Sequence, residues 1–338
     1  MIRDIRERRD LMAKTVIEQI RNDLYRAEIP LPRNPLKATN SYIMKGNPRN
    51  LVIDTGMNRE ECKTALLDAF DQLDVDMQKT DFFVTHLHAD HVGLVDELSA
   101  ENALIYFNEP DAQILNKKDL WQLVVSLAGR HGFPAELVNM AIDSHPGQRY
   151  SPKDEVEFSM VEDGDILRYG EYELHCVVTP GHTSGHTCLY EPHLKYFFSG
   201  DHILGDITPN ISTWLDESNP LAEYFNSLDR VYKMNVDLVL PGHRSLIKDC
   251  RGRIEELKKH HRDRLVEVVE ILSENGPKSA YEVASKMTWD LVAADWEDFP
   301  IMQKWFATGE ALAHIRYLEV EGKVKRGGDE HQQLYLID

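Results

Sequence analysis

The chain has 338 residues, of which 42% are hydrophobic, so it can bury a sizeable core and form two or three structural units. Its formal net charge of −19, from 57 acidic against 38 basic residues, disfavours a nucleic-acid partner held by general attraction to phosphates. Four scattered cysteines without a CxxC pair indicate reduced core thiols, which favours a cytoplasmic protein. We find no secretory signal and no apolar run of about 18 residues, so a membrane partner is not expected.

The first part of the chain combines a helical pattern with several short strands. Apolar residues recur at helical spacing over residues 3–24, which predicts an N-terminal helical extension, residues 1–24. Prolines interrupt residues 29–40. Two strands are expected at 41–44 and 51–54, a helix at 60–73, and strands at 81–86 and 103–107.

The middle of the chain alternates between helical and strand patterns. Leucine and valine recur at helical spacing over residues 109–145, which predicts a helical insertion broken at residues 131–134. Strand patterns return over 157–204, followed by a helix over 221–235 and a strand over 237–240. This alternation, in two halves, predicts a layered α/β catalytic domain over residues 25–250.

Beyond residue 250 the pattern predicts a separate unit. A long helix over 252–274, a short helix over 280–287, a helix over 300–321 and a β-hairpin turning at Gly327–Gly328 make a winged-helix-like domain over 251–338. Its 13 Lys and Arg against 17 Asp and Glu give a net charge of −4, whereas a nucleic-acid reader is normally basic. A structural or homodimer-forming role is therefore favoured. Five aromatic residues here are candidates for packing on the catalytic domain or lining its site: Trp289, Trp296, Phe299, Trp305 and Phe306.

The most informative stretch is THLHADH, residues 85–91, which follows an apolar strand pattern. Three other strand patterns end in the same way, with a glycine and then a potential ligand, at residues 180–182, 200–201 and 241–243. Glycine lets the backbone turn sharply and pass close to a bound group. The candidate metal ligands are His86, His88, Asp90, His91, His182, Asp201 and His243.

Neutral imidazoles and carboxylates suit zinc, and also iron or manganese. Seven ligands are too many for one tetrahedral zinc ion but suit two divalent ions that share a carboxylate, for which Asp201 is the natural bridge. An isolated histidine is more often an ordinary surface or core residue. We interpret six others in that way: His131, His145, His175, His193, His260 and His261. His186 and His202 stand beside ligands and are candidates for a supporting role.

Together with Asp54-Thr55-Gly56, these motifs resemble the metallo-β-lactamase superfamily, in the family's order and over residues 25–250. The resemblance implies an αββα sandwich with a dinuclear site at one edge. It assigns His86, His88 and His182 to the first metal. It assigns Asp90, His91 and His243 to the second metal, and Asp201 to both.

Differences within the family narrow the expectation. Antibiotic-degrading members usually carry cysteine at the Asp201 position, flavodiiron members usually carry glutamate at the His88 position, and glyoxalase II members have glutathione-binding C-terminal helices. Sulfur dioxygenases with one iron share the HxHxDH motif and remain an alternative. The chain looks more like cytosolic members with a winged-helix-like domain, which include endoribonucleases and hydrolases of unassigned substrate. Residues 200–212 also resemble a subgroup with thioesterases and quinolone-signal response proteins.

We therefore expect a hydrolase that uses a metal-bridging hydroxide, since two bound ions lower the pKa of water to about 7. Its substrate would be an ester or thioester of a small molecule, with Asp90 as both ligand and proton acceptor. Asp54 would orient ligands, or simply form a turn. An endoribonuclease or other phosphodiesterase, and a regulatory or binding protein with little catalysis, are the alternatives. The 109–145 insertion would form a lid over a narrow acyl pocket, or lie at the periphery.

Overall fold

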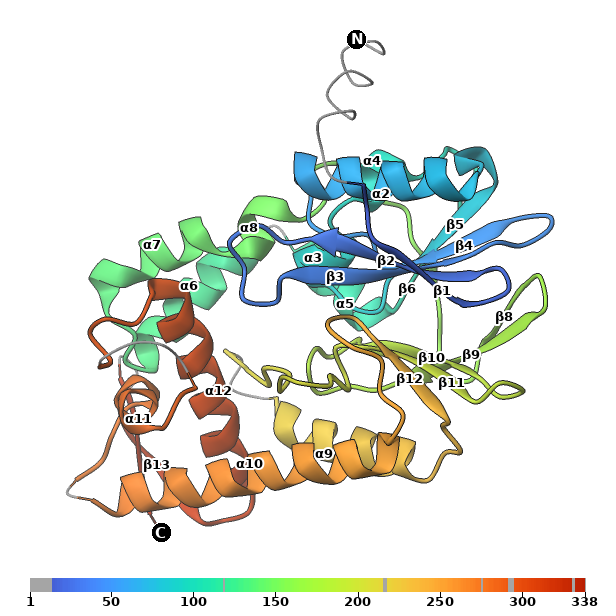
Figure 1. Cartoon of the computed structure of the whole chain (residues 1–338). Coiled ribbons are helices and arrows are strands. Elements are labelled where there is room, and N and C mark those ends of the chain that lie inside the picture. The colour runs from blue at the N-terminus through green and yellow to red at the C-terminus, as the bar shows by residue number, and fades with distance from the viewer. Residues whose placement is uncertain are drawn as a thin grey trace.

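The computed structural model of the chain describes residues 14–117, 119–214, 218–274, 276–290, 295–329 and 332–337. Within these residues two β-sheets lie face to face, and helices cover the outer face of each sheet (Figure 1). The layers follow the order helix, sheet, sheet, helix. This order confirms the αββα sandwich that the resemblance implied.

In the described residues, the first sheet pairs seven strands in chain order: β1 (Ile17–Arg21), β2 (Leu24–Pro30), β3 (Ala38–Met44), β4 (Asn50–Ile53), β5 (Thr80–Phe83), β6 (Ile105–Phe107) and β7 (Ser159–Met160). The second sheet runs in the spatial order β12 (Leu238–Pro241), β11 (Tyr196–Gly200), β10 (Thr187–Glu191), β9 (Tyr172–Val178) and β8 (Ile166–Tyr169). β5 is parallel to β4 and β6, and β11 is parallel to β12. The carboxyl ends of parallel strands meet at one edge of a sheet, which gathers the loops that follow them.

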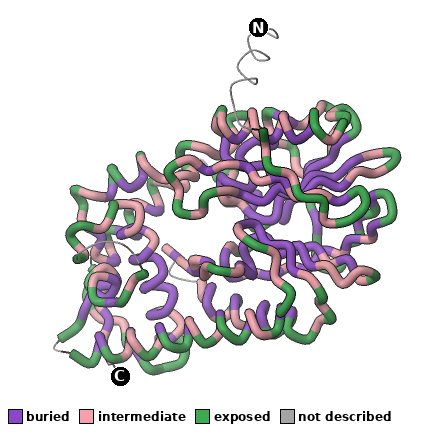
Figure 2. The backbone as a smooth tube through the Cα atoms, viewed as in Figure 1, coloured by how far each residue is buried: buried purple, intermediate pink, exposed green. Residues whose placement is uncertain are grey.

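The core between the sheets comes from residues that alternate along the strands. Tyr42, Ile53 and Phe83 of the first sheet pack against Leu174 and Phe198 of the second. The rings of Tyr42 and Phe198 meet edge-on, with 5.3 Å between their centroids. Buried residues concentrate in the two sheets and on the inner faces of the helices (Figure 2). This packing fixes the strand ends, and with them the loops of the site.

The outer helices bury the apolar stripes from which they were predicted. α2 (Glu60–Leu73) places Leu66 and Phe70 on the first sheet, near the short helices η1 (Met77–Lys79), α3 (Ala89–Val92) and α4 (Val95–Leu98). α9 (Pro220–Tyr232) and the first half of α10 (Cys250–Ser273) cover the second sheet through Leu228 and Leu257. Stripes of this kind are typical of helices with one buried face.

The predicted N-terminal helix is wrong where the structure describes it. Residues 1–13 lie outside the described residues, and residues 17–21 form strand β1 instead of a helix. β1 pairs with β2 across a turn in which Asp23 has a φ of 61°. β2 in turn pairs with β3. The helical spacing of Ile17 and Ile20 was thus overridden by pairing with a strand that lies further along the chain.

The predicted insertion is helical throughout most of its length. It contains α5 (Glu109–Leu115), α6 (Leu120–Arg130) and α7 (Ala135–Ser144), and a further short helix, α8 (Pro146–Tyr150), follows directly beyond the predicted end. α6 and α7 pack against Trp305 through Val124, Phe133 and Val138. Because Trp305 belongs to the C-terminal part of the chain, the insertion and that part share one apolar cluster.

The C-terminal part shows the expected order of elements. α11 (Ala280–Lys286), α12 (Ile301–Val320), β13 (Val324–Gly328) and β14 (Gln333–Ile337) follow α10, whose second half packs against α11 and α12. The predicted turn at Gly327–Gly328 is wrong: Gly327 pairs with Leu334 and Gly328 with Gln333, so both belong to β13. The turn therefore follows Gly328.

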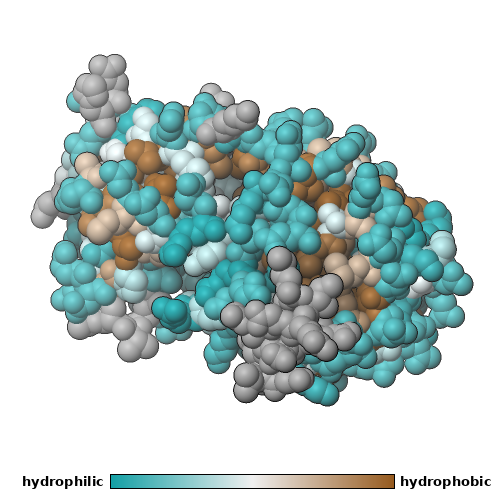
Figure 3. All heavy atoms as spheres, turned by 90° about the horizontal axis from the view of Figure 1, so that it is seen from above, coloured by the Kyte–Doolittle hydropathy of each residue, from teal (hydrophilic) through white to brown (hydrophobic). Residues whose placement is uncertain are grey.

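Two further expectations concern the surface and the thiols. The four cysteines are free and buried, as expected of core residues. The surface is predominantly hydrophilic when viewed from above (Figure 3), in keeping with the acidic composition. Among the described residues, we find no helix with the length and apolar character needed to cross a bilayer.

Candidate metal centre

The seven predicted ligands come from four loops that converge between the two sheets. His86, His88, Asp90 and His91 follow β5, and the other three follow β9, β11 and β12. Within the described residues, the ligand atoms of each of three overlapping groups lie within 4.8 Å of one another. These groups are His86, His88 and His182; Asp90, His91 and His243; and His86, His91 and Asp201.

Asp201 lies between the two main groups. Its Oδ2 is 3.7 Å from Nε2 of His182 and 3.4 Å from Nε2 of His243. Its Oδ1 is 3.6 Å from Nε2 of His91. One carboxylate therefore faces donor atoms of both groups, as a bridging ligand must.

The buried polar atoms of the site test whether a metal fits. Four of them have no hydrogen-bond partner among the described residues: Nε2 of His86, His91 and His243, and Oδ1 of Asp201. A buried polar atom without a partner is costly, and here these atoms face a common space. Divalent metal ions such as zinc bind imidazole nitrogens and carboxylate oxygens, so this donor set fits them.

The opposite ring nitrogens of the histidines have partners that hold each ring in place. Nδ1 of His91 lies 2.7 Å from Asp54 Oδ2, and Nδ1 of His86 lies 3.0 Å from Thr85 Oγ1. Nδ1 of His182 lies 2.8 Å from the backbone carbonyl oxygen of Asn210. Nδ1 of His243 lies 2.7 Å from the backbone carbonyl oxygen of Ala38. When Nδ1–H of a neutral imidazole donates a hydrogen bond to such a partner, Nε2 keeps a lone pair that can bind a metal ion. Such partners orient histidine ligands and raise their basicity.

Asp54 holds the loop after β5 as well as His91. Its carboxylate accepts hydrogen bonds from the backbone N–H of Thr85, at 2.9 Å, and from the Thr85 hydroxyl. Its φ of 60° lies in the left-handed region, which an aspartate adopts at a cost. The side chain thus contacts one candidate ligand and the segment that carries three more.

The two supporting histidines differ in their contacts. Nε2 of His186 accepts a hydrogen bond from the backbone N–H of Asp201, at 3.1 Å, and its Nδ1 lies 2.9 Å from Thr179 Oγ1. His202 is buried, with its ring 5.4 Å from that of Tyr224. Only His186 has a hydrogen bond to a candidate ligand among the contacts described.

Burial and charge divide the site into two electrostatic halves. Burial lowers the pKa of His86 well below its usual value and that of His88 to about 3, so both imidazoles are neutral. Burial is the largest single influence on His91 and opposes its charged form, but the carboxylates of Asp54, Asp201 and Asp90 together outweigh burial and raise the pKa of His91 to about 8. Burial likewise opposes the charged form of His243, but Asp201 and Asp90 together outweigh burial and raise the pKa of His243 well above its usual value.

Glycines allow the ligand loops to approach one another. A Cβ on Gly242 would lie 2.6 Å from Oδ1 of Asp201 and 2.8 Å from Cε1 of His91. Gly200 has a φ of 47°, and a Cβ there would lie 2.8 Å from Nε2 of His186. These positions are the glycines that precede ligands in the sequence, and the structure leaves no room for a side chain at either.

The sequence analysis missed Asp111, at the start of the insertion. Its buried carboxylate accepts hydrogen bonds from the Leu87 N–H at 2.9 Å, the Thr183 hydroxyl at 2.7 Å and the Gly185 N–H at 2.6 Å. It thereby joins the loops that carry His88 and His182. Burial raises the pKa of Asp111 to about 6, although these hydrogen bonds oppose the shift. No motif marks Asp111, because its role depends on contacts between distant loops.

Replacing Asp111 by asparagine is expected to weaken metal binding by about ten- to a hundredfold. The amide nitrogen of asparagine donates hydrogen bonds and does not accept them, so at least one of the three donors would lose its acceptor. Zinc competition with a chromophoric chelator measures the effect. Glu109→Gln is the matched control, since Glu109 is exposed on the same helix. Equal affinity of the Asp111→Asn and Glu109→Gln proteins would contradict a role for Asp111 in holding the loops.

Glu310 of α12 was also missed. Its Oε2 accepts a hydrogen bond from the side-chain amide of Asn210 at 2.8 Å, and the carbonyl oxygen of Asn210 lies next to His182. Burial raises the pKa of Glu310 to about 7. The C-terminal part of the chain therefore reaches a candidate ligand through one intervening residue.

A cavity of about 1140 Å³ opens onto the metal centre. His88, Asp90, His182 and Asp201 line it at the metal site. Helices α6 and α12 line it further away, so the insertion lies on the cavity and not at the periphery. Among the five aromatic candidates of the C-terminal part, three line the cavity: Trp289, Trp305 and Phe306. The volume lies slightly above the range of about 300–1,000 Å³ usual for ligand pockets, and the lid over a narrow acyl pocket stays a prediction.

Comparison with known proteins agrees with this geometry. A family model of the metallo-beta-lactamase superfamily matches residues 34–243, and a model of the metallo-beta-lactamase-like C-terminal domain matches residues 265–335. The chain is 26% identical to a probable metallo-hydrolase of Bacillus subtilis, over 83% of this chain and 87% of that protein. It is 23% identical to a human acyl-coenzyme A thioesterase, over 60% of this chain and 72% of that protein.

A solved structure shows the same architecture over nearly the whole chain. The crystal structure of a metallo-beta-lactamase family protein from Thermus thermophilus superposes with a TM-score of 0.81 and 27% sequence identity, covering 95% of this chain and 100% of that one. Three observations agree on the family: the fold, the convergence of histidines and aspartates, and the family match. The chain belongs to the metallo-beta-lactamase superfamily and is one of its metal-dependent hydrolases.

Proposed function

We propose that the chain is a dinuclear metallohydrolase that cleaves an ester or thioester of a small molecule. The position of Asp201 carries this proposal, because its two carboxylate oxygens face donor nitrogens of both ligand groups at 3.4–3.7 Å. The similarity to a human protein named as an acyl-coenzyme A thioesterase supports the choice of bond.

Seven side chains would hold the two ions, most simply zinc, with iron or manganese as alternatives. His86, His88 and His182 would bind one ion. Asp90, His91 and His243 would bind the other, and Asp201 would contact both. Bound divalent ions lower the pKa of a bound water to about 7 and act as a Lewis acid for the carbonyl oxygen.

The protein's own groups would orient the substrate and handle protons. Asp90 lines the cavity and lies 3.4 Å from Nε2 of His243, measured from its Oδ2. Burial opposes its ionised form, but His91 and His243 outweigh burial and lower the pKa of Asp90 to about 2. Asp90 is therefore ionised, as a metal ligand must be, and its place in the cavity lining would put it within reach of a substrate held at the metals. Asp54 would keep the His91 ring oriented throughout.

The test combines metal analysis with two classes of substrate. Protein purified without added metal is analysed for bound metals and assayed with short acyl-coenzyme A thioesters and a single-stranded RNA, with and without chelator. About two metals per chain and chelator-sensitive thioester cleavage are expected. Cleavage of RNA alone would favour the phosphodiesterase alternative, and one iron without either activity would favour sulfur oxidation.

Metal binding should strengthen as the pH rises. Nearby carboxylates raise the pKa of His91 to about 8 and that of His243 well above its usual value, so both imidazoles hold a proton near neutral pH in the metal-free site. A metal must displace those protons, so apparent affinity should rise about tenfold per pH unit for each proton displaced. Zinc competition from about pH 6 to about pH 8, corrected for the chelator's own protonation, measures the slope. An affinity independent of pH over that range would contradict the assignment of these two histidines as ligands.

A further inference from the structure

Part of the cavity lining, formed by residues other than the metal ligands, is apolar and largely aromatic. Six residues form it, and we call them the aromatic chamber: Trp121, Val124, His145, Trp214, Trp305 and Phe306. They come from three parts of the chain. Trp121 and Val124 belong to α6, and Trp305 and Phe306 to α12. His145 and Trp214 lie in connecting segments.

The rings of the chamber pack mainly against one another. The centroids of Trp214 and Trp305 are 4.3 Å apart, with 34° between the ring planes. His145 lies 4.8 Å from Trp121 and 5.7 Å from Phe306. Rings already paired with one another have fewer free faces for stacking a flat aromatic ligand, which favours contact with a flexible aliphatic group.

The chamber presents no charge from its own side chains. Burial lowers the pKa of His145 to about 4, so the imidazole is neutral. Its Nδ1 accepts a hydrogen bond from the Gly147 N–H at 3.1 Å, which satisfies a polar atom that would otherwise face the cavity wall. Aliphatic residues continue the lining towards the metal centre: Met57, Leu87, Ile114, Leu115, Leu120, Leu204 and Ile207.

We infer that the aromatic chamber binds the aliphatic acyl chain of the substrate while the scissile carbonyl lies at the metal centre. This inference rests on the proposed ester or thioester hydrolysis and adds the class of acyl group. Charged side chains such as Arg149, Lys153 and Glu155 also line the cavity, but none belongs to the chamber. A cavity of about 1140 Å³ that holds both a polar ligand set and an uncharged aromatic cluster matches a molecule with a polar head and a long apolar tail. α6 and α12 together limit the chain length, so the insertion and the C-terminal domain both determine specificity.

The first experiment measures kcat/KM of the metal-loaded protein for a series of saturated acyl-coenzyme A thioesters from two to twelve carbons. Burial of each methylene should improve kcat/KM by about fourfold until the chamber is filled. Equal kcat/KM along the series would overturn the inference while leaving the proposed hydrolysis intact. Hydrolysis of none of these substrates would instead count against the proposed function.

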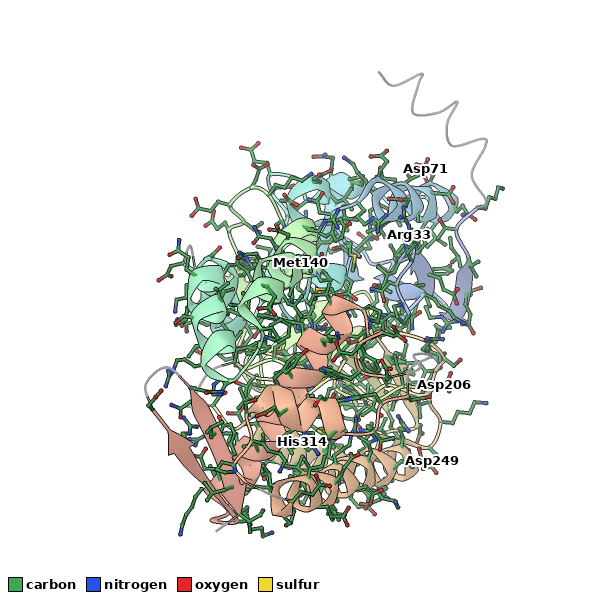
Figure 4. All side chains as sticks on the ribbon, turned by 90° about the vertical axis from the view of Figure 1, so that its left-hand side faces the viewer. Arg33, Asp71, Met140, Asp206, Asp249 and His314 are labelled. Carbon is green, nitrogen blue, oxygen red and sulfur yellow. The ribbon has the colours of Figure 1, made fainter. Side chains whose placement is uncertain are left out.

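Two variants locate the acyl chain. Val124→Phe adds volume inside the chamber and should shift the preferred chain to fewer carbons, lowering kcat/KM for dodecanoyl substrates at least about tenfold more than for acetyl and butyryl substrates. Trp121→Ala removes volume from the half-buried wall and should extend the preference to longer chains. Met140→Phe is the matched control, because Met140 is 51% exposed on α7 of the same insertion (Figure 4). A uniform loss for short and long substrates in both variants would overturn the inference.

A binding measurement tests the chamber without hydrolysis. Titration with dodecanoate should change the tryptophan fluorescence of the wild-type protein and of the Met140→Phe protein. The Val124→Phe protein should bind dodecanoate at least about tenfold more weakly, with butyrate as the negative control. Unchanged dodecanoate affinity in the Val124→Phe protein would place the chain elsewhere.

Discussion

Replacing Asp201 by asparagine is expected to lower the hydrolytic activity by about three orders of magnitude and to reduce the bound metal to at most one ion per chain. Asp201 is the carboxylate that faces both ligand groups, and an amide offers one weak oxygen donor and no negative charge. Two readouts are needed, metal content by elemental analysis and thioester hydrolysis at saturating metal.

The matched control for this variant is Asp206→Asn. Asp206 is exposed and lies five residues further along the same segment (Figure 4). The Asp206→Asn protein should keep the metal content and activity of the wild-type protein. Two tightly bound ions and full activity in the Asp201→Asn protein would contradict the bridging role.

Adding one methyl group at Gly242 should be nearly as damaging. An alanine Cβ there would lie 2.6 Å from Oδ1 of Asp201 and 2.8 Å from Cε1 of His91, so a bridging carboxylate and a histidine ligand must move. A displacement of this size at a reactive centre costs about a hundredfold in rate. We expect Gly242→Ala to fold, to bind metal more weakly and to lose about that factor in kcat/KM.

Gly205→Ala separates this effect from a general intolerance of alanine near the site. A Cβ on Gly205 would have its nearest neighbours at 3.5 Å, which is ordinary van der Waals contact. Its metal affinity and activity should equal those of the wild type, and circular dichroism should report the same fold for both variants. If Gly242→Ala and Gly205→Ala behaved alike, the close approach at Gly242 would not limit the site.

The sequence was most informative where local pattern and global fold agree. The ligands were predictable because each set follows an apolar strand, with a glycine directly before His182, Asp201 and His243, and the parallel pairs β5 with β6 and β11 with β12 place strand ends at sheet edges. The helices α2 and α9 were predictable because an apolar stripe at helical spacing needs one surface to pack on.

The failures came from contacts that a local pattern does not contain. Ile17 and Ile20 have helical spacing, yet β1 pairs with β2, which is held in turn by β3. The glycines of the C-terminal hairpin suggested a turn, but their partners Leu334 and Gln333 place both in a strand. In both places, hydrogen bonds to residues elsewhere in the chain decided the outcome.

The sequence by itself determined the family, the layered fold and the candidate ligands, because each of these is written in short motifs with fixed local geometry. Only the tertiary structure decided how the site is supported and what shape of substrate it accepts. Asp111 binds Leu87 and Gly185, and Glu310 reaches His182 through Asn210, although a hundred residues separate Glu310 from Asn210. The cavity likewise lies between α6 and α12, and its volume depends on how two remote segments pack, which no single stretch of sequence specifies.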